Sequence, residues 1–447
     1  MRVDVAVVGL GPGGELVATK LAEGGLRVAA VEARLVGGEC PYYACVPTKM
    51  MIRAAHALAE ARRVGELGGT AEVHTDWSMV AARIRDEATD DWDDAVAVER
   101  LTKAGVQFVR GRGRIVGKGR LQVGDQTIHA EKGIVLNPGT EPAVPPIDGL
   151  SDTPFWTNRD AVRAKAVPGE LVVIGGGPVG CEFAQVFSRF GARVTLVQSA
   201  GRLLPRDEPE AGELLAEQFA GEGIDVRVGA KVSHVAYDGA NFSVTVDGDT
   251  VKAAQVLVAA GRRTDLRALG VAEYGVDDTA KGIAVDERMR AAEGLWAIGD
   301  VTGEGAFTHM SMYQGEIAVA DILGQDKTAD YRAVPWVTFT DPEVGSVGLT
   351  EQQARDKGID VRTGATLIPS SSRGWIHKVG NEGFIKLVVD AGRGVLVGAT
   401  SCGPTGGEVL GALAVAVHAE VPVEQLRRMI FAYPTFHRAI AAALEDL

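Results

Sequence analysis

The segment VDVAVVGLGPGGELVATKLAEGGLRVAAVE spans residues 3–32 and decides the fold class. An apolar run rich in β-branched residues leads into a cluster of glycines, a helical stretch follows, and a second apolar run ends at Glu32. The segment ELVVIGGGPVGCEFAQVFSRFGARVTLVQ, residues 170–198, repeats this arrangement. Each segment predicts a βαβ unit, and their separation along the chain predicts two nucleotide-binding domains.

The glycines of the first unit follow the spacing Gly9-x-Gly11-x-x-Gly14. Gly9 permits a tight turn, Gly11 lets the backbone approach a pyrophosphate, and Gly14 lets helix and strand pack closely. The start of the helix offers partial positive charge to the phosphates. Glu32, at the end of the second strand, is placed to accept hydrogen bonds from an adenosine ribose.

The second unit has the spacing Gly175-x-Gly177-x-x-Gly180, but Gln198 stands where a ribose-binding acid is expected. A carboxylate there would favour NADH by repelling the 2′-phosphate of NADPH, and its absence removes that repulsion. No basic pair adjoins Gln198, and the nearest cation, Arg202, can belong to a turn instead. These residues do not decide between NADH and NADPH as the cofactor, and they favour NADPH only weakly.

The segment GGECPYYACVPTK, residues 37–49, carries two cysteines five positions apart. A regular helix would hold their Cα atoms beyond the ~7 Å limit for a disulfide, so we expect Cys40 in an irregular turn. Pro47 is tolerated in a first helical turn, which predicts a helix start near Val46 and places Cys45 at the helix's positive end, where a thiolate is favoured. Such a pair suits thiol–disulfide exchange. A zinc half-site is disfavoured because no second pair stands at ligand spacing, and we expect no metal.

Composition limits the classes of partner. The net charge of −13 over 447 residues argues against nucleic acid and anionic membranes. No apolar run reaches the ~20 residues of a membrane span, and no secretory signal is visible, so a cytoplasmic location is expected. The acidic run DEATDDWDD, residues 86–94, is interpreted as a solvated face.

Three regions organise the chain. The fold predicted is α/β, with two Rossmann-like nucleotide-binding domains plus a C-terminal α+β domain. The first nucleotide-binding domain is split over residues 1–150 and 276–330, and the second covers 151–275. From residue 331 to 447, segments such as WVTFT, GFIKLVVD and GVLVGATSC predict an antiparallel sheet followed by helices.

The pattern Gly37-Gly38-x-Cys40-x-x-x-x-Cys45-x-Pro47-x-Lys49 resembles the redox-disulfide motif of the flavoprotein disulfide reductases. That group includes dihydrolipoamide dehydrogenase, glutathione reductase and mercuric reductase. GGGPVGCEFA at 175–184, AIGDV at 297–301 and VGLTE at 347–351 are similar to further motifs of the group. The resemblance implies FAD and NAD(P)H as cofactors, and a homodimer whose C-terminal domain is the dimerisation domain.

The resemblance also implies residue roles. Cys45 would contact the flavin and Cys40 would exchange with substrate, while Lys49 and Glu182 would pair near the reactive flavin nitrogen. Asp300 would bind a ribityl hydroxyl, and Thr308 and His309 would face the ring from a helix start. Further cofactor-binding residues expected are Pro12, Gly13, Ala33, Gly38, Gly139, Gly261, Arg262 and Gly299.

The chain departs from the group at its C-terminal end. The group has His-Pro-Thr-x-x-Glu, whose His serves the partner subunit's interchange thiol as acid and base. Here Tyr433 replaces that His and Arg438 replaces the Glu. A tyrosine is a poor base at neutral pH because it ordinarily titrates near ~10, although it can donate a hydrogen bond. His437 is the alternative base.

Other departures are Tyr42-Tyr43 between the cysteines and Asn137-Pro138-Gly139 in a flavin-domain turn. Cys181 and Cys402 are expected to be buried, and without a terminal cysteine pair mercuric reduction is disfavoured. Three functions stay open. The first is reduction of a small-molecule or protein disulfide, and the second is direct reduction of quinones, dyes or metal ions. The third is a flavin-binding redox sensor or scaffold with little turnover.

Overall fold

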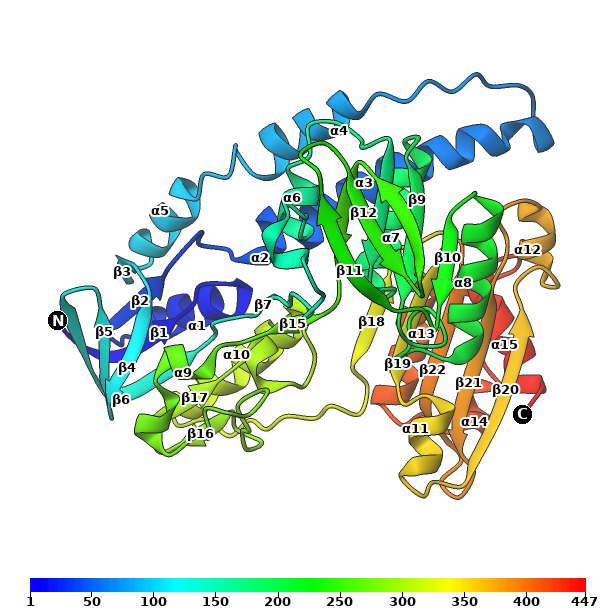
Figure 1. Cartoon of the computed structure of the whole chain (residues 1–447). Helices are drawn as coiled ribbons and strands as arrows, with labels where there is room; N and C mark the ends of the chain where they lie inside the picture. The colour runs from blue at the N-terminus through cyan, green and yellow to red at the C-terminus, as the bar shows by residue number, and fades with distance from the viewer. The chain divides into compact units, whose positions relative to one another are not determined.

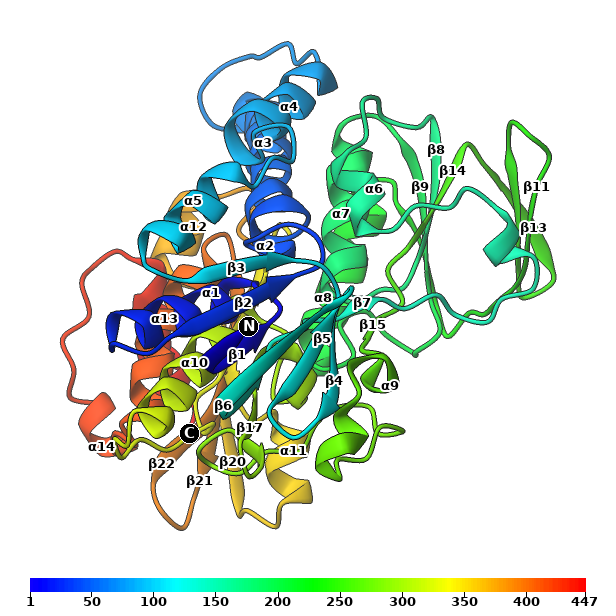
Figure 2. The ribbon, with the colours of Figure 1, turned by 90° about the vertical axis from the view of Figure 1, so that its left-hand side faces the viewer.

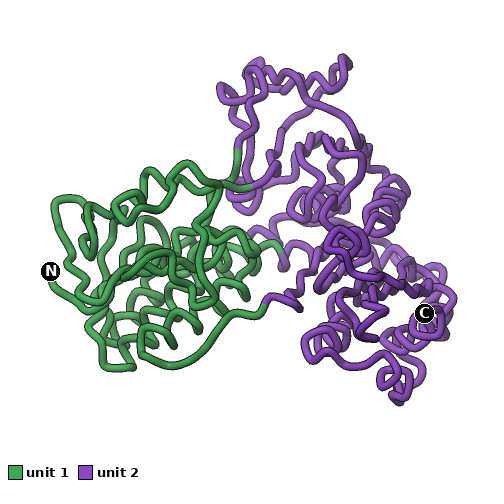
Figure 3. The backbone as a smooth tube through the Cα atoms, turned by 90° about the horizontal axis from the view of Figure 1, so that it is seen from below, with its two compact units in different colours: residues 1–48, 82–143, 262–330 green, residues 49–81, 144–261, 331–447 purple.

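The computed structural model describes residues 1–447 as two compact units (Figure 3). Unit 1 contains Met1–Thr48, Ala82–Ala143 and Arg262–Asp330. Unit 2 contains Lys49–Ala81, Val144–Gly261 and Tyr331–Leu447. Each unit therefore combines stretches that are distant in sequence.

Unit 1 is built on an eight-stranded sheet in which β1 lies between β2 and β6, parallel to both. The path of this sheet is β16-β17-β6-β1-β2-β3, and β4 and β5 extend it from β6 as antiparallel strands. The bounds are β1 Arg2–Val8, β2 Val28–Glu32, β3 Gln107–Arg110, β4 Gly113–Gly117, β5 Arg120–Val123, β6 Gln126–Leu136, β16 Arg290–Ala292 and β17 Leu295–Ala297. The central parallel strands β1 and β2 are mostly buried, which explains their nearly continuous apolar sequences.

Helices α1 (Pro12–Glu23) and α10 (Thr308–Ile322) pack against each other in unit 1 (Figure 2). Their contact is close because Gly13 has no side chain: a Cβ there would lie 2.2 Å from the Ser311 Oγ. The remaining short elements of unit 1 are α2 Glu39–Tyr42, η2 Ile84–Ala88, α5 Ala95–Lys103, β7 Glu141–Pro142, β15 Arg262–Arg263, α9 Leu266–Leu269, η4 Val271–Tyr274 and η5 Gly299–Thr302.

Unit 2 contains a second parallel sheet with the order β10-β9-β8-β14 and a separate antiparallel sheet β11-β12-β13. The strands are β8 Glu170–Ile174, β9 Arg193–Gln198, β10 Asp225–Val228, β11 Val232–Tyr237, β12 Phe242–Val246, β13 Asp249–Ala253 and β14 Gln255–Val258, and the helical segments are η3 Leu150–Asp152, α6 Asn158–Val162, α7 Pro178–Arg189 and α8 Pro209–Gly221. Both predicted βαβ units are therefore present.

The rest of unit 2 contains a five-stranded antiparallel sheet, β18-β19-β22-β21-β20, against which α13 packs (Figure 1). Its elements are β18 Pro335–Thr338, β19 Glu343–Gly348, α11 Glu351–Asp356, β20 Val361–Leu367, α12 Ser372–His377, β21 Phe384–Asp390, β22 Val395–Gly403, α13 Gly406–His418, α14 Val423–Leu426, η6 Phe436–Arg438 and α15 Ala439–Glu445. The antiparallel sheet predicted from residue 335 onward is confirmed.

The helix predicted near Val46 is α3, which runs from Cys45 to Arg63 and is followed by η1 Val64–Glu66 and α4 Trp77–Arg83. The expectation of an irregular turn at Cys40 is wrong, since Cys40 lies in the one-turn helix α2. Tyr43, with φ of −140°, ends that turn and separates it from α3. The three-domain boundaries stay a prediction. None of the helices has the length and hydropathy needed to cross a bilayer.

Candidate redox and nucleotide sites

The side chain of Cys45 meets the start of a second helix. Cys45 is exposed and is the first residue of α3, and its Sγ lies 3.3 Å from the Oγ1 of Thr308, the first residue of α10. Both helix starts carry partial positive charge, and a hydroxyl can donate to a sulfur anion. Cys40 is half-buried, five residues before Cys45. These surroundings favour a thiolate at Cys45.

The first glycine turn has the geometry its spacing predicts. Gly9 has a φ of +88°, and a Cβ at Gly14 would lie 2.0 Å from the Gly9 carbonyl oxygen. Gly38 belongs to the cysteine-bearing residues 37–49, here called the redox segment, and lies over the same turn, because its Cβ would be 2.9 Å from the Gly11 Cα. Only backbone fits here, so a phosphate can approach Gly11 and the first turn of α1, which begins at Pro12.

Asn137 holds three segments of unit 1 together. It is buried, and its amide is satisfied when the oxygen accepts from the Gly14 N–H at 2.9 Å. The amide nitrogen then donates to the Ser311 Oγ at 2.9 Å and to the Ile298 carbonyl oxygen at 3.2 Å. The sequence marked Asn137 as a departure from the group, but it did not indicate this role, because the three partners lie on distant segments.

Two carboxylates lie at the ends of strands in unit 1. Glu32 accepts from the Leu10 N–H at 2.8 Å and from the Arg34 N–H at 2.7 Å. Asp300 accepts a hydrogen bond from the Thr140 hydroxyl at 2.7 Å. Glycine backbone, a helix start and carboxylates beyond strand ends are what a dinucleotide such as FAD requires, so these residues fit that cofactor.

Other residues expected to bind a cofactor lie in unit 1, except Gly261, which belongs to unit 2. The Arg262 side chain donates through Nε to Thr140 Oγ1 at 2.6 Å, so it supports the loop that carries Thr140. The His309 ring stacks on Phe307 with centroids 5.2 Å apart. Also within unit 1 are Ala33 directly after β2, Gly139 with φ of +63°, and Gly299 at the start of η5.

The second glycine turn, in unit 2, is similar to the first. Gly175 has a φ of +115°, and a Cβ at Gly180 would lie 1.8 Å from the Gly175 carbonyl oxygen. A Cβ at Gly177 would meet nothing within 4 Å, so this backbone is open to a ligand. Gln198 ends β9 and is buried. Arg202 donates to the carbonyl oxygens of Pro205 and Asp207, which confirms that it belongs to a turn.

Lys49 and Glu182 form the predicted ion pair within unit 2. Lys49 Nζ lies 3.0 Å and 2.9 Å from the two carboxylate oxygens of Glu182, which is only 6% exposed. The Phe339 N–H also donates to Glu182 at 2.9 Å, and Lys49 Nζ lies 4.6 Å from the centre of the Phe339 ring. Sequence reasoning missed Phe339, which lies 157 positions from Glu182.

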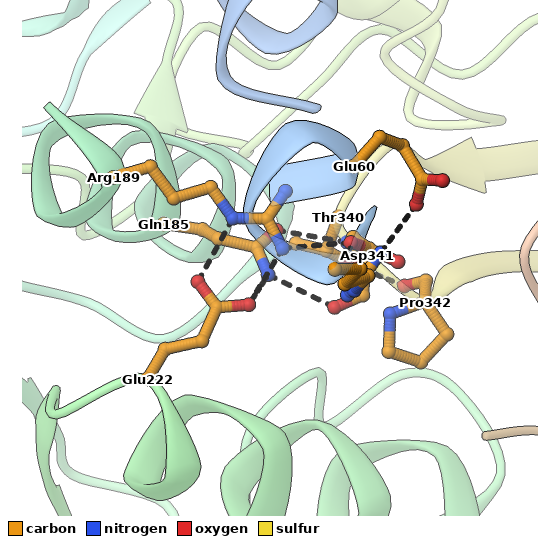
Figure 4. A network of polar contacts seen from close by, with 8 residues as sticks. Glu60, Gln185, Arg189, Glu222, Thr340, Asp341 and Pro342 are labelled. Atoms are coloured by element: carbon orange, nitrogen blue, oxygen red, sulfur yellow. Dashed lines mark hydrogen bonds and ion pairs between the residues drawn. The ribbon is translucent and has the colours of Figure 1, made fainter. Parts of the chain in front are cut away.

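The same face of α7 continues into a polar network (Figure 4). Gln185 accepts from the Asp341 N–H and donates to the Asp341 carbonyl oxygen, at 2.8 and 2.9 Å. Arg189 bridges Asp341 and Glu222 at 2.7 and 2.6 Å, and Arg63 of α3 reaches Asp341 at 2.8 Å. Burial alone would raise the pKa of Asp341, but Arg189 and Arg63 lower it overall. This network fixes the segment before β19 against α7.

The C-terminal residues expected to act in a partner's site lie in unit 2. Tyr433 is 69% exposed, and the guanidinium of Arg438 lies 5.6 Å from its ring centre. His437 Nε2 lies 3.5 Å from Thr435 Oγ1. The expectation that Cys181 and Cys402 are buried is confirmed, and burial raises the pKa of both thiols.

These features define a flavoprotein disulfide reductase, and the family comparison agrees. Residues 3–315 match the family model of the pyridine nucleotide-disulphide oxidoreductases, and residues 334–444 match their dimerisation domain. The chain belongs to this family of FAD-dependent oxidoreductases that use a pyridine nucleotide. The predicted fold class and the resemblance are confirmed.

Relatives of several kinds match nearly the whole chain. A mercuric reductase of Acidithiobacillus ferrooxidans is 32% identical over 99% of this chain and 82% of its own length. A dihydrolipoyl dehydrogenase of Geobacillus stearothermophilus is 32% identical over 100% of this chain and 96% of its own length. The crystal structure of LpdA from Mycobacterium tuberculosis has a TM-score of 0.87 at 26% identity, covering 100% and 99% of the two chains. The Cu(II) complex of the HOCl-induced flavoprotein disulfide reductase RclA from Escherichia coli has a TM-score of 0.86 at 25% identity, with coverage of 100% and 99%.

Proposed function

We propose that this oxidoreductase uses Cys40 and Cys45 as its redox pair to reduce a small-molecule disulfide. The observation that supports this most is the contact between Cys45 Sγ and Thr308 Oγ1 at 3.3 Å. A cysteine that begins one helix and contacts the start of another is well placed to leave as a thiolate. An alternative is that Cys40 and Cys45 are unreactive thiols in the core. The exposure of Cys45 disfavours this alternative.

FAD, when bound, supplies the two-electron centre between the nicotinamide and the cysteines. In the reduced pair, the Cys40 thiolate attacks one sulfur of the acceptor and displaces the first thiol. Cys45 then attacks Cys40, which releases the second thiol and forms the Cys40–Cys45 disulfide. The acceptor gains two electrons and two protons, and the cysteine pair loses them.

The Lys49–Glu182 pair would bring a cation toward the flavin. A cation held there favours the reduced anionic form of the ring, which makes acceptance of a hydride easier. Glu182 would act by holding Lys49 in position, since its carboxylate accepts two hydrogen bonds from Lys49 Nζ.

For the nicotinamide cofactor we propose NADPH. The neutral amide of Gln198 stands where a carboxylate would repel the 2′-phosphate. Arg202, four residues on, donates to the carbonyl oxygens of Pro205 and Asp207, and its charge also acts on the Asp207 carboxylate, so the proposal rests on Gln198. The Gln198→Glu variant is expected to lower kcat/KM for NADPH relative to NADH by about tenfold, a loss of about 1.4 kcal/mol in discrimination. An unchanged ratio would contradict the assignment.

A second candidate is direct reduction of a metal ion or quinone. It is supported by Tyr433 and Arg438, which take the places of an acid–base pair that only thiol substrates need. The names of two relatives point the same way, since one is a mercuric reductase and the other was solved as a Cu(II) complex.

An acceptor screen separates these two candidates. NADPH consumption is measured with a disulfide panel, with menadione and with Cu(II), for the wild type and for Cys45→Ser. The disulfide proposal expects turnover of disulfides that Cys45→Ser abolishes, together with loss of the long-wavelength charge-transfer band of the reduced enzyme. Full turnover of quinone or Cu(II) by Cys45→Ser, with no disulfide reduced by the wild type, favours the second candidate. Bound FAD without turnover of any acceptor would favour the third, a redox sensor.

The C-terminal replacement can be tested directly. If the missing base limits disulfide reduction, Tyr433→His combined with Arg438→Glu raises its rate, and an unchanged rate would defeat that account. His437→Ala reports whether the adjacent histidine serves instead. We further propose that the protein acts as a homodimer, since it has the family's dimerisation domain, and that it works in the cytoplasm.

A further inference from the structure

The acidic segment, residues 86–94, is interpreted from the sequence as a solvated face. In the structure, part of it contacts the backbone directly before the redox segment. Asp94 is only 8% exposed, and one of its oxygens accepts from the Val36 N–H at 2.7 Å and from Arg110 at 2.6 Å. The earlier interpretation is therefore wrong at Asp94. The reason is that Val36 lies just before the glycines of the redox segment and needs an acceptor when buried.

Two further contacts join this segment to Tyr42, one of the residues between Cys40 and Cys45. The Trp92 indole Nε1 donates to the Tyr42 carbonyl oxygen at 3.1 Å. The Tyr42 hydroxyl donates to the Asp93 carbonyl oxygen at 3.4 Å. Tyr42 is buried, and burial with the nearby carboxylates raises its pKa to about 12, so the hydroxyl keeps its proton. Tyr42 is thus held at both its backbone and its side-chain end.

The backbone of the acidic segment is strained. Asp90, Asp91 and Trp92 have φ values of +48°, +53° and +60°, three consecutive non-glycine residues in the left-handed region. Each such residue costs about 1 kcal/mol or more, and such a conformation persists only where the surroundings impose it. Thr89, which is buried, helps to impose it, because its hydroxyl accepts from the Trp92 N–H and donates to backbone carbonyls of the preceding turn.

We propose that Asp90–Asp94 is a clamp that positions Cys40 for exchange with Cys45. Tyr42 lies two residues after Cys40 and three before Cys45, so holding Tyr42 restricts the loop that must close when the disulfide forms. A restricted loop raises the effective concentration of one thiol for the other. Trp92 is a positioning residue, and this inference rests on the proposed thiol relay.

The test compares two tryptophan variants that lose the same kind of hydrogen bond. Trp92→Phe removes the bond to Tyr42 but keeps an aromatic ring. Trp77→Phe is the matched control, because the Trp77 Nε1 donates at 2.8 Å to the carbonyl oxygen of Ala164, which lies outside residues 37–49, and both residues belong to unit 2. The FAD-loaded proteins are equilibrated anaerobically with glutathione buffers, quenched by alkylation, and the Cys40–Cys45 disulfide is measured by mass spectrometry.

Oxidised glutathione takes two electrons and two protons from the Cys40 and Cys45 thiols and becomes two molecules of reduced glutathione. Loss of one hydrogen bond should lower the effective thiol concentration by about fivefold in Trp92→Phe, with no change in Trp77→Phe. Reduction of the flavin by NADPH should have the same rate in all three proteins. A Trp92→Phe curve equal to the wild type, or shifted the other way, overturns the clamp.

A second variant tests the same clamp in case Trp92→Phe does not fold. Tyr42→Phe removes only the hydroxyl and should shift the glutathione equilibrium in the same direction by about twofold. No shift in either clamp variant overturns the proposal. If the wild type forms no Cys40–Cys45 disulfide in any buffer, the thiol relay itself is wrong, a result distinct from a relay that works equally well without the clamp.

Discussion

Cys45 and Thr308 are 263 positions apart, yet the Sγ of one lies 3.3 Å from the Oγ1 of the other, and each is the first residue of its helix. Two helix starts therefore face one sulfur. The fold of unit 1 creates this arrangement because α3 leaves the redox segment close to where α10 begins. Removal of the Thr308 hydroxyl therefore tests whether this contact stabilises a thiolate at Cys45.

The Thr308→Val variant removes the hydroxyl but keeps the branched shape of the side chain. In a Cys40→Ser background, the rate at which iodoacetamide alkylates Cys45 at pH 7 should fall about three- to tenfold, since one hydrogen bond to the thiolate is lost. Thr102→Val, at an exposed position on α5, is the control and should leave the rate unchanged. Equal rates in both variants would show that the hydroxyl does not stabilise the thiolate.

The Asn137→Ala variant leaves the Gly14 N–H and the Ser311 hydroxyl without their amide partner. A buried group that loses its hydrogen bond costs about 1–3 kcal/mol, so thermal unfolding should begin at a lower temperature and FAD should dissociate more readily. Differential scanning calorimetry and the release of flavin fluorescence measure the two effects. Asn241→Ala, in an exposed turn, should change neither. Retention of FAD at the wild-type level would argue that the amide does not shape the cofactor turn.

The Glu182→Gln variant removes the charge opposite Lys49. Because the Lys49 side chain is 36% exposed, solvent screens the pair, and the free energy of unfolding should fall by only about 1–2 kcal/mol. Adding Lys49→Met should cost less than the sum of the single changes, since the two residues interact. Urea titrations measure these values, with the exposed Glu217→Gln as control. Strict additivity would contradict a direct interaction.

His56 makes stability depend on pH between about 4 and 6.5. Burial lowers the pKa of His56 from 6.5 to about 4, so over that range the unfolded chain binds a proton that the folded protein does not. Stability must therefore fall as the pH is lowered through this window. The His56→Gln variant cannot take up that proton, and its loss of stability from pH 7 to pH 4.5 should be smaller by about 2 kcal/mol. His74→Gln, at an exposed position, should follow the wild type. Parallel curves for His56→Gln and wild type would refute the assignment.

Local patterns predicted much of the fold. The glycine spacings at residues 9–14 and 175–180 located both βαβ units, because the steric demand of such a turn is written in a few adjacent positions. Pro47 located the start of α3 to within one residue. The alternation from residue 335 onward predicted the antiparallel sheet.

Other features depended on contacts that no local pattern contains. Asp94 was misinterpreted because a carboxylate in an acidic run has the same local sequence whether it faces water or the Val36 N–H. Phe339 was missed because its backbone N–H, which any residue type but proline supplies, makes the contact with Glu182.

The residues alone were enough to predict the fold class and the two nucleotide-binding motifs, because both depend on residue type at short spacing. The same kind of local pattern makes Cys40 and Cys45 the predicted redox pair. Only the tertiary structure decided which hydroxyl contacts Cys45, which amide braces the Gly14 turn and which segment holds Tyr42. Those contacts join residues tens to hundreds of positions apart, and their geometry follows from how whole sheets and helices pack. The types of reactive and binding residue could therefore be predicted from the sequence, whereas the contacts that position them depend on the tertiary fold.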